Sequence, residues 1–325
     1  MTARLIDHRL GSVELERLAD RLATPCQLGA YALDGLICRT STALVFVARG
    51  GAFGSEEGVI KLTGRAYSPL LDHELRLLNW CREADVRGVV GPVRSELEWL
   101  ENDAAAMLLP FLDGGDLVQW IGAHTNGSGN LGPRVALEVG EHVGGILRTL
   151  LQLPRPLVHR DVKPQNVLLA HPGAPLAALT LIDLDVSEEL DILPEQFGSA
   201  PREVAESLVG DVRGFGELLF DVATGRDPPA QGPPNPNSGN AAFDALVEKC
   251  LTSVAGGPGY TSVADAGLWL DMAAALDREP DRTPVGGSLP GRPLVPGGGR
   301  RYLAVLAASL LIGLVAAVAC KVLIG

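Results

Sequence analysis

The segment Leu157–Leu169, which reads LVHRDVKPQNVLL, places three kinds of polar side chain between two apolar runs. Asp161 can accept a proton from a hydroxyl group, and Lys163 can neutralise charge on a phosphoryl group during its transfer. Asn166 can offer an oxygen atom to a divalent cation. The apolar runs on either side are typical of short buried strands, so the polar residues are expected on a loop held by rigid elements. This spacing indicates phosphoryl transfer.

With His159 and Arg160 before the aspartate and Pro164 after the lysine, the segment resembles the catalytic loop of eukaryotic-like (Hanks-type) protein kinases. A lysine two residues after the aspartate is typical of the serine/threonine branch. The resemblance implies an α+β, bilobal fold with a small β-rich N-terminal lobe and a larger helical C-terminal lobe. It also implies ATP with Mg²⁺ or Mn²⁺, and protein substrates that carry hydroxyl groups. The catalytic residues would be Asp161, Lys163 and Asn166.

Two charged residues upstream match the same family. Lys61 lies in the strand-like run GVIKL, and Glu74 lies in SPLLDHELRLLNWCREA, where apolar residues recur at helical spacing. Strands are expected over Leu36–Arg49 and Gly58–Leu62, and a helix is expected over 68–84. The resemblance implies that Lys61 holds the α- and β-phosphates of ATP and that Glu74 is its ion-pair partner.

The stretch AAAMLLPFLDGGDL resembles the last small-lobe strand of a kinase and the hinge that follows it. Backbone groups would read adenine there, so the carbonyl of Pro110 and the N–H of Leu112 are the expected contacts. Leu109 would lie at the back of the nucleotide site, and Asp116 would reach the ribose. The full set that the resemblance assigns to nucleotide binding is Lys61, Glu74, Val45, Val59, Leu109, Pro110, Leu112, Asp116 and Leu168.

A second acidic position follows the catalytic loop, where ALTLIDLDVS is expected to form a buried strand that ends at Asp183. In the family an Asp-Phe-Gly sequence stands here, and its aspartate binds the metal. The metal ligands implied for this chain are therefore Asp183 and Asn166. Asp185 replaces the glycine and removes a flexible backbone joint. Further on, Asp211 is expected to hold the backbone of the catalytic loop.

Three segments depart from the family pattern. The segment CRTSTA at 38–43 occupies the place of the glycine-rich nucleotide loop and has none of its glycines. Val59 stands where a small alanine is usual, and the activation segment over 183–203 is short. These departures support an alternative function, a pseudokinase that serves as a membrane-anchored scaffold for a nucleotide or a partner. The complete polar set favours a kinase.

The activation segment contains two possible phosphate acceptors, Ser187 and Ser199. In many kinases a phosphate on this segment pairs with the arginine before the catalytic aspartate, here Arg160. A carboxylate could replace that phosphate through charge-assisted hydrogen bonds, and the alternative is that the acids are simply solvated. The hypothesis is that activity needs no phosphate on the segment. The candidate acids are Glu188, Glu189, Asp191 and Glu195.

Composition limits the other classes of function. The chain has 325 residues, of which 46% are hydrophobic and 20% are charged, enough to bury a sizeable core. Its formal net charge of −12 argues against a nucleic-acid-binding surface. The five cysteines show no metal-binding spacing, and the first residues lack the apolar run of a signal peptide.

The C-terminal region changes in composition from about Asp277, where proline and glycine become frequent. The run Tyr302–Cys320 that follows contains no charged residue, and as a helix it would span roughly 28 Å, enough to cross a bilayer. Arg300 and Arg301 place the preceding domain in the cytoplasm by the positive-inside rule. The expectation is a single-pass protein of the inner or plasma membrane. Ser309, Gly313 and Ala317 lie on one helical face at four-residue spacing, which is compatible with a weak homodimer through this helix; the alternative is that they reflect the small residues common in any membrane helix.

These patterns divide the chain into four predicted parts. They are an N-terminal extension over 1–27, a protein kinase domain over 28–275, a Pro/Gly-rich linker over 276–301 and a transmembrane helix over 302–321.

Overall fold

The computed structural model of the protein describes residues 8–22, 25–125, 131–229 and 234–278. All of these belong to one compact unit, Met1–Val285. The predicted transmembrane helix at 302–321 and nearly all of the predicted linker lie outside the described residues. Among the helices that are described, none combines the length and apolar character needed to cross a membrane.

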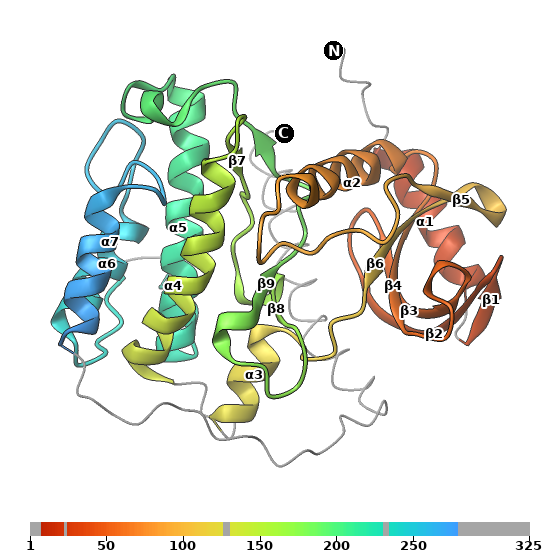
Figure 1. The fold of residues 1–325 in the computed structure, drawn as a ribbon, viewed down its shortest axis with the longest axis horizontal. Helices are drawn as coiled ribbons and strands as arrows, with labels where there is room; N and C mark the ends of the chain where they lie inside the picture. Colours follow the sequence, from red (N-terminus) through yellow and green to blue (C-terminus); the bar gives the residue numbers. More distant parts are fainter. Residues whose placement is uncertain (1–7, 23–24, 126–130, 230–233, 279–325) are drawn as a thin grey trace, which may run out of the picture. The chain divides into compact units, whose positions relative to one another are not determined.

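The first half of the unit is built on one antiparallel sheet of six strands in the order β1-β2-β3-β4-β6-β5 (Figure 1). The strands are β1 (Cys26–Leu28), β2 (Tyr31–Arg39), β3 (Leu44–Gly50), β4 (Gly58–Thr63), β5 (Glu98–Leu100) and β6 (Ala104–Pro110). Burial alternates along β3, where Leu44 and Phe46 are buried and Val45 is partly exposed. Val45 lies opposite Lys61 of β4, so these two residues share the second face of the sheet. The predicted strand range Leu36–Arg49 is interrupted by a turn between β2 and β3.

Helix α1 (His8–Arg21) covers the core face of this sheet. Its residues Leu15 and Leu18, with Leu22 just beyond its end, repeat at helical spacing and pack into one cluster with Phe46 and Leu62. The described part of the predicted N-terminal extension therefore packs against the six-stranded sheet, which forms the predicted small lobe.

Helix α2 (Ser68–Glu83) forms where the sequence predicts it, with Pro69 in its first turn. Its apolar face buries Leu71, Leu75, Leu78 and Cys81. Glu74 lies on the same buried face and is only 2% exposed. A carboxylate in that position requires a partner, because burying an unpaired charge is costly.

The second half is mainly helical, and its long helices α4 and α5 pack side by side (Figure 1). The helices are α3 (Leu117–His124), α4 (Gly132–Leu151), α5 (Arg202–Thr224), α6 (Ala241–Leu251) and α7 (Ala266–Leu276). Gly140 of α4 permits the close approach to α5, because a Cβ atom there would lie 2.7 Å from Leu219. Four short strands complete this half as two antiparallel pairs, β7 (Leu157–Val158) with β10 (Glu188–Glu189) and β8 (Val167–Leu169) with β9 (Leu179–Leu181). The buried strands predicted on either side of the polar loop are thus β7 and β8.

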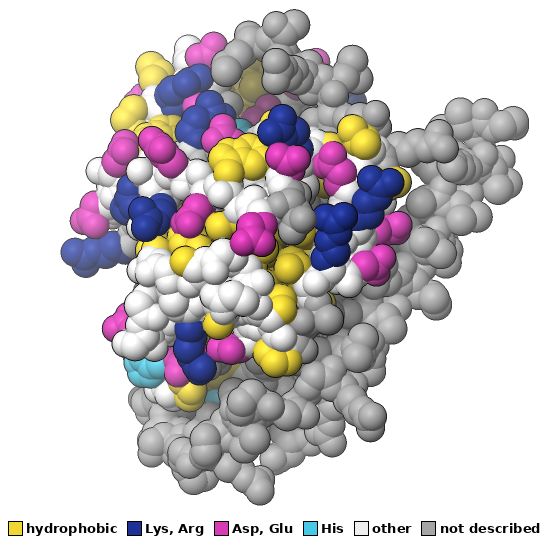
Figure 2. Space-filling view, turned by 90° about the vertical axis from the view of Figure 1, so that its right-hand side faces the viewer, with side chains coloured by type: hydrophobic (Ala, Val, Ile, Leu, Met, Phe, Trp, Pro, Cys, Tyr) yellow, Lys and Arg dark blue, Asp and Glu magenta, His cyan; other side chains and the backbone are white. Residues whose placement is uncertain are grey.

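The face shown in Figure 2 carries basic and acidic side chains that are interspersed, with apolar side chains between them. The small lobe has one large exposed aromatic residue, Trp99 of β5, within the ranges that the structure describes. The guanidinium of Arg65 lies 5.6 Å from the centre of its ring, a cation–π distance.

Candidate active site

The loop between β7 and β8 is held through its backbone by a buried acid. Asp211 of α5 accepts hydrogen bonds from the backbone N–H of His159 at 2.8 Å and from that of Arg160 at 2.6 Å. Burial raises the pKa of Asp211, and these donors act in the opposite direction. Arg160 has a φ of 69°, a left-handed conformation that is unusual for a side chain of this size. The two hydrogen bonds to Asp211 hold it there, as the sequence predicts.

His159 connects this loop to the strand that leads to Asp183. Its ring is fully buried, and its Nδ1 atom accepts from the backbone N–H of Asp161 at 3.3 Å. Because Nδ1 is an acceptor, the ring proton is on Nε2, which donates to the carbonyl of Ile182 at 3.1 Å. The side chain therefore fixes the separation of the two predicted acidic positions.

The three residues predicted to be catalytic lie in contact with one another. Lys163 Nζ donates to Asp161 Oδ2 at 2.6 Å, and Asn166 Nδ2 donates to the same oxygen at 2.8 Å. Asn166 Nδ2 also donates to the carbonyl of Asp161 at 2.9 Å. Both side-chain bonds end on Oδ2, so Asp161 Oδ1 remains open to a hydroxyl group. The amide oxygen of Asn166 is likewise left for another partner.

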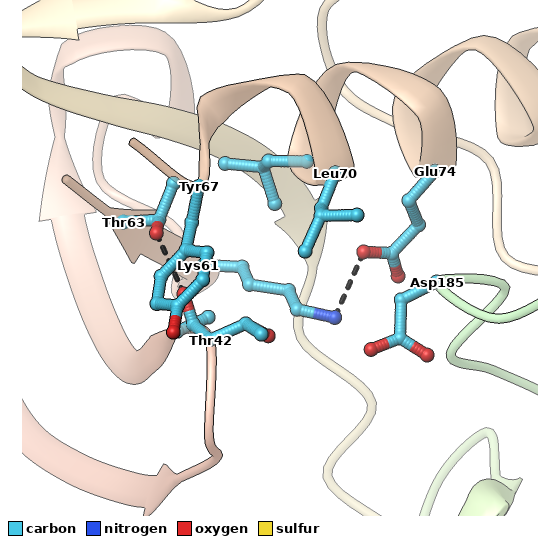
Figure 3. A pocket seen from close by; sticks show the side chains of 9 residues that line it. Thr42, Lys61, Thr63, Tyr67, Leu70, Glu74 and Asp185 are labelled. Carbon is cyan, nitrogen blue, oxygen red and sulfur yellow. Dashed lines mark hydrogen bonds and ion pairs between the residues drawn. The ribbon is translucent and has the colours of Figure 1, made fainter. Parts of the chain in front are cut away.

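Lys61 of β4 lies between two acids from distant parts of the chain, and Figure 3 shows it directed toward Glu74. Its Nζ atom donates to Glu74 Oε2 and to Asp183 Oδ1, both at 2.8 Å. Lys61 is 7% exposed; burial disfavours its charge, but the two carboxylates outweigh that effect and raise its pKa. Burial raises the pKa of the Glu74 carboxyl to about 7, against the lowering influence of Lys61. The ion pair predicted between Lys61 and Glu74 is present.

Asp183 adopts a left-handed conformation with a φ of 69°, and the next residue, Leu184, is completely buried. Asp185, which replaces the usual glycine, lines a small pocket together with Lys61 and Glu74 (Figure 3). Burial and the nearby Asp183 carboxylate raise the pKa of Asp185. This chain therefore gathers one more carboxylate around Lys61 than the family pattern requires.

The turn between β2 and β3 is closed by a threonine hydroxyl in place of glycines. Thr40 Oγ1 accepts from the backbone N–H of Thr42 at 3.2 Å and from that of Ala43 at 2.9 Å. The backbone of Thr40 donates to the carbonyl of Ala43 at 2.9 Å. Thr63 Oγ1 donates to the carbonyl of Thr42 at 2.6 Å and attaches the turn to β4. Two backbone amides of the predicted phosphate-covering loop are thus already hydrogen-bonded within the turn.

The apolar residues predicted to bind the nucleotide share one kind of environment. All four are partly exposed, although most of their strand neighbours are buried, and they are Val45, Val59, Leu109 and Leu168. Val59 lies directly opposite Leu109 in the β4–β6 pair. Their role in binding stays a prediction.

The predicted hinge begins where β6 ends, at the exposed Pro110, and Leu112 lies just beyond the strand. Asp116 caps helix α3, because its Oδ1 atom accepts from the backbone N–H of Gln119 at 2.8 Å. Burial raises the pKa of Asp116. Its other oxygen, Oδ2, accepts from Gln119 Nε2 at 3.4 Å, and contact with a ribose stays a prediction for this residue.

Comparison with known proteins identifies the architecture. No family model matches the chain. A solved structure, a mutant form of the PknI kinase domain of Mycobacterium tuberculosis, matches it with a TM-score of 0.52 and 17% sequence identity. The match covers 79% of this chain and 98% of that chain. This chain has the protein kinase fold.

Curated serine/threonine protein kinases are similar to the chain in sequence. ATG1a of Arabidopsis thaliana is 26% identical over 214 residues, which make up 62% of this chain and 32% of that protein. PkaA of Streptomyces coelicolor is 27% identical over 197 residues, 57% of this chain and 33% of that protein. PrkC of Bacillus subtilis is 26% identical over 136 residues, 39% of this chain and 20% of that protein. The chain thus spans about a third or less of the length of these relatives.

The activation segment forms several ion pairs, of which the sequence predicted only the one to Arg160. Glu188 Oε2 lies 3.3 Å from Arg160 Nη1, so one of the four candidate carboxylates does pair with that arginine. The partners of Glu189, which are Arg155 and Arg76, were missed. Ser187, considered as a phosphate acceptor, is only 4% exposed. No sequence spacing indicates these contacts, because the partners come from separate elements.

Proposed function

We propose that this chain is an ATP-dependent serine/threonine protein kinase that transfers the γ-phosphoryl group to hydroxyl groups of proteins. The main support is that the predicted residues form two hydrogen-bonded clusters. One contains Asp161, Lys163 and Asn166, and the other contains Lys61, Glu74 and Asp183. Similarity to serine/threonine kinases in both sequence and fold supports the same activity.

In this proposal Asp161 orients the acceptor hydroxyl and takes its proton on Oδ1, the oxygen that Lys163 and Asn166 leave open. Lys163 is close enough to Asp161 to lie beside the reacting groups, where its ammonium stabilises charge on the γ-phosphoryl group. Lys61 holds the α- and β-phosphates, and Glu74 keeps the lysine side chain directed toward them.

Mg²⁺ or Mn²⁺ is implied by this chemistry, and the donor set fits either ion. The Asn166 amide uses its nitrogen for both hydrogen bonds to Asp161, which leaves its oxygen free, and Asp183 retains the oxygen that Lys61 does not bind. Mg²⁺ is usually held by one or two carboxylates together with substrate phosphates. Once bound, it would neutralise phosphate charge.

Nucleotide binding would use both lobes. Apolar contacts to adenine come from the partly exposed Val45, Val59, Leu109 and Leu168. The backbone carbonyl of Pro110 and the N–H of Leu112 would bind the edge of the base. The Thr40 turn would cover the phosphates with fewer available amides than a glycine-rich loop offers.

The test is transfer of labelled γ-phosphate by the full-length chain to itself and to a generic acceptor such as casein. Asp161→Asn should lower kcat by about 10²- to 10⁴-fold, because it removes the general base, and should leave nucleotide affinity nearly unchanged. Asp277→Asn removes an exposed carboxylate at the end of α7 and serves as the matched control. Equal rates in the two variants would contradict the proposal.

A second candidate is a pseudokinase that binds a nucleotide or a partner without transferring phosphate. The hydrogen-bonded amides of Thr42 and Ala43 favour it, as does the short activation segment, whose last residues already belong to α5 from Arg202 onward. Magnesium-dependent nucleotide binding without phosphate transfer in the same assay would support this reading over the first.

We also propose that the apolar run at 302–321 attaches the kinase domain to the cytoplasmic face of the inner or plasma membrane. The support is the sequence pattern alone, the uncharged residues 302–320 preceded by Arg300 and Arg301. Deletion of residues 302–325 should move the protein from the membrane pellet to the soluble fraction without loss of folding. A truncated protein that still sediments with membranes would show that another segment anchors the chain.

Self-association through the same run is proposed as weak. It rests on Ser309, Gly313 and Ala317, small residues at four-residue spacing. Crosslinking of the full-length chain in membranes should capture a dimer, and Gly313→Leu should reduce its yield.

A further inference from the structure

Two adjacent glutamates form the short strand β10, and they extend in different directions. The strand pairs antiparallel with β7, so that Glu188 lies opposite Val158 and Glu189 opposite Leu157. Successive side chains of a strand point to opposite faces. One strand of two residues can therefore contact two different sets of partners.

Glu188 connects the activation segment to the catalytic loop and to α5. Its Oε2 atom lies 3.3 Å from Arg160 Nη1 and accepts from the hydroxyl of Ser207 at 2.9 Å. Arg160 is the residue that immediately precedes Asp161 and that Asp211 holds in a left-handed conformation. Glu188 therefore adds a charged contact at the residue that sets the position of the proposed base.

Glu189 connects the same segment to helix α2 and to the chain before β7. It lies 2.9 Å from Arg155 Nη1 and 3.6 Å from Arg76 Nη2. The side chain of Glu189 is 17% exposed, whereas that of Glu188 is 45% exposed. Glu189 is therefore the more buried of the two carboxylates. Arg76 lies two residues after Glu74, so this contact reaches the helix that supplies the partner of Lys61.

A third connection runs through Ser187 and reinforces the second. Arg76 donates to His73 Nδ1 at 2.7 Å, which leaves the ring proton on Nε2 for the carbonyl of Ser187 at 3.2 Å. The Ser187 hydroxyl donates to the carbonyl of His159 at 3.0 Å and is buried. Phosphorylation of Ser187 would break that hydrogen bond. It would also place a negative charge of roughly −2 in a buried position.

We propose that Glu188 and Glu189 are positioning residues that hold the catalytic loop and helix α2 in their working arrangement without a phosphate on the activation segment. The inference rests on the proposed kinase function and specifies how that site is regulated. The carboxylates make the charged contacts to arginine that a phosphate group makes in a phosphorylated segment. A matching prediction is that the protein is active as synthesised.

The first experiment uses the full-length chain produced together with a serine/threonine phosphatase, with the absence of phosphate confirmed by intact mass. The wild type should transfer phosphate in this state. Glu188→Gln should mainly lower kcat, while Glu189→Gln should also raise the KM for ATP, because it releases α2 and with it Glu74. Each effect should be roughly two- to tenfold, since the pairs are partly exposed. Glu195→Gln, an exposed acid of the same segment, is the control with the same change of charge and should match the wild type.

The second experiment asks whether Glu189 acts through its arginine. Arg155→Met should reproduce part of the effect of Glu189→Gln, and the double variant should be no worse than the more affected single variant. Effects that multiply as independent factors would overturn the coupling. A phosphate-free wild type that is inactive and gains activity on phosphorylation would overturn the whole inference.

Hydrogen exchange separates this inference from the proposed function. Glu189→Gln should increase exchange in α2 and in residues 187–190, whereas Glu195→Gln should not. If no form of the protein transfers phosphate, the proposed function fails, and exchange alone decides the role of the two glutamates. Equal exchange in both variants would show that Glu189 does not hold α2.

Discussion

The predicted catalytic loop between β7 and β8 and the turn between β2 and β3 are both fixed by hydrogen bonds, but the bonding partners come from different places. In the catalytic loop, backbone and ring groups are bonded by residues far along the chain, Asp211 and Ile182. In the turn, the amides of Thr42 and Ala43 are bonded by Thr40, from within the same few residues. A loop that is held from outside can present its own polar groups to a ligand, whereas a loop that is held from within has fewer groups to offer.

Lys61 lines a small pocket with Thr42 and Ala43 of the turn and pairs with Asp183, and its removal should have the largest effect on stability. Lys61→Met leaves Glu74 buried without its cation, which should cost about 3–5 kcal/mol of unfolding free energy in urea denaturation. The double variant Lys61→Met/Glu74→Leu should recover most of that stability but no activity. If the double variant were as unstable as the single one, the buried charge would not be the cause.

The support of the catalytic loop by Asp211 can be broken separately. In Asp211→Asn the amide nitrogen cannot accept, so one of the two backbone N–H groups loses its partner. An unsatisfied buried donor costs about 1–3 kcal/mol, and kcat should fall because Arg160 leaves its left-handed conformation. Urea denaturation and steady-state kinetics check the two effects. Asp221→Asn, a change on the same helix away from the loop, is the control.

A substitution in the turn between β2 and β3 should improve a property, ATP affinity, and its effect should be the smallest of the three. Thr40→Val keeps the shape of the side chain but frees the amides of Thr42 and Ala43, each of which could then bond a phosphate oxygen for about 0.5–1.5 kcal/mol. ATP should bind more tightly and adenosine should not, as measured by calorimetry with Mg²⁺ present. Thr40→Ser retains the hydroxyl and should behave like the wild type.

A gain for adenosine as large as that for ATP would contradict this account of the turn. Weaker binding of both ligands in Thr40→Val would instead show that the closed turn is itself the form that covers the nucleotide. Either result would remove the contrast between the two loops.

Local sequence was sufficient for the elements whose signals lie close together. Helical spacing of apolar residues predicted α2 almost to its ends, and the apolar runs beside the polar loop predicted β7 and β8. The Lys61–Glu74 pair was predictable because family motifs place its members on a defined strand and a defined helix. The closed turn was not, since nothing in a run of small polar residues shows which hydroxyl will satisfy which amide.

What the sequence alone determined about this protein is the identity and order of its chemical groups, from Lys61 through Asp161 to Asp183. Tertiary structure decided which groups are available and which are occupied. It buried Ser187, joined Glu189 to Arg76 and Arg155, and used one oxygen of Asp116 to cap a helix. The physical reason is that hydrogen-bond partners and burial depend on elements that meet only in the folded chain, whereas spacing along one element is already present in the unfolded one.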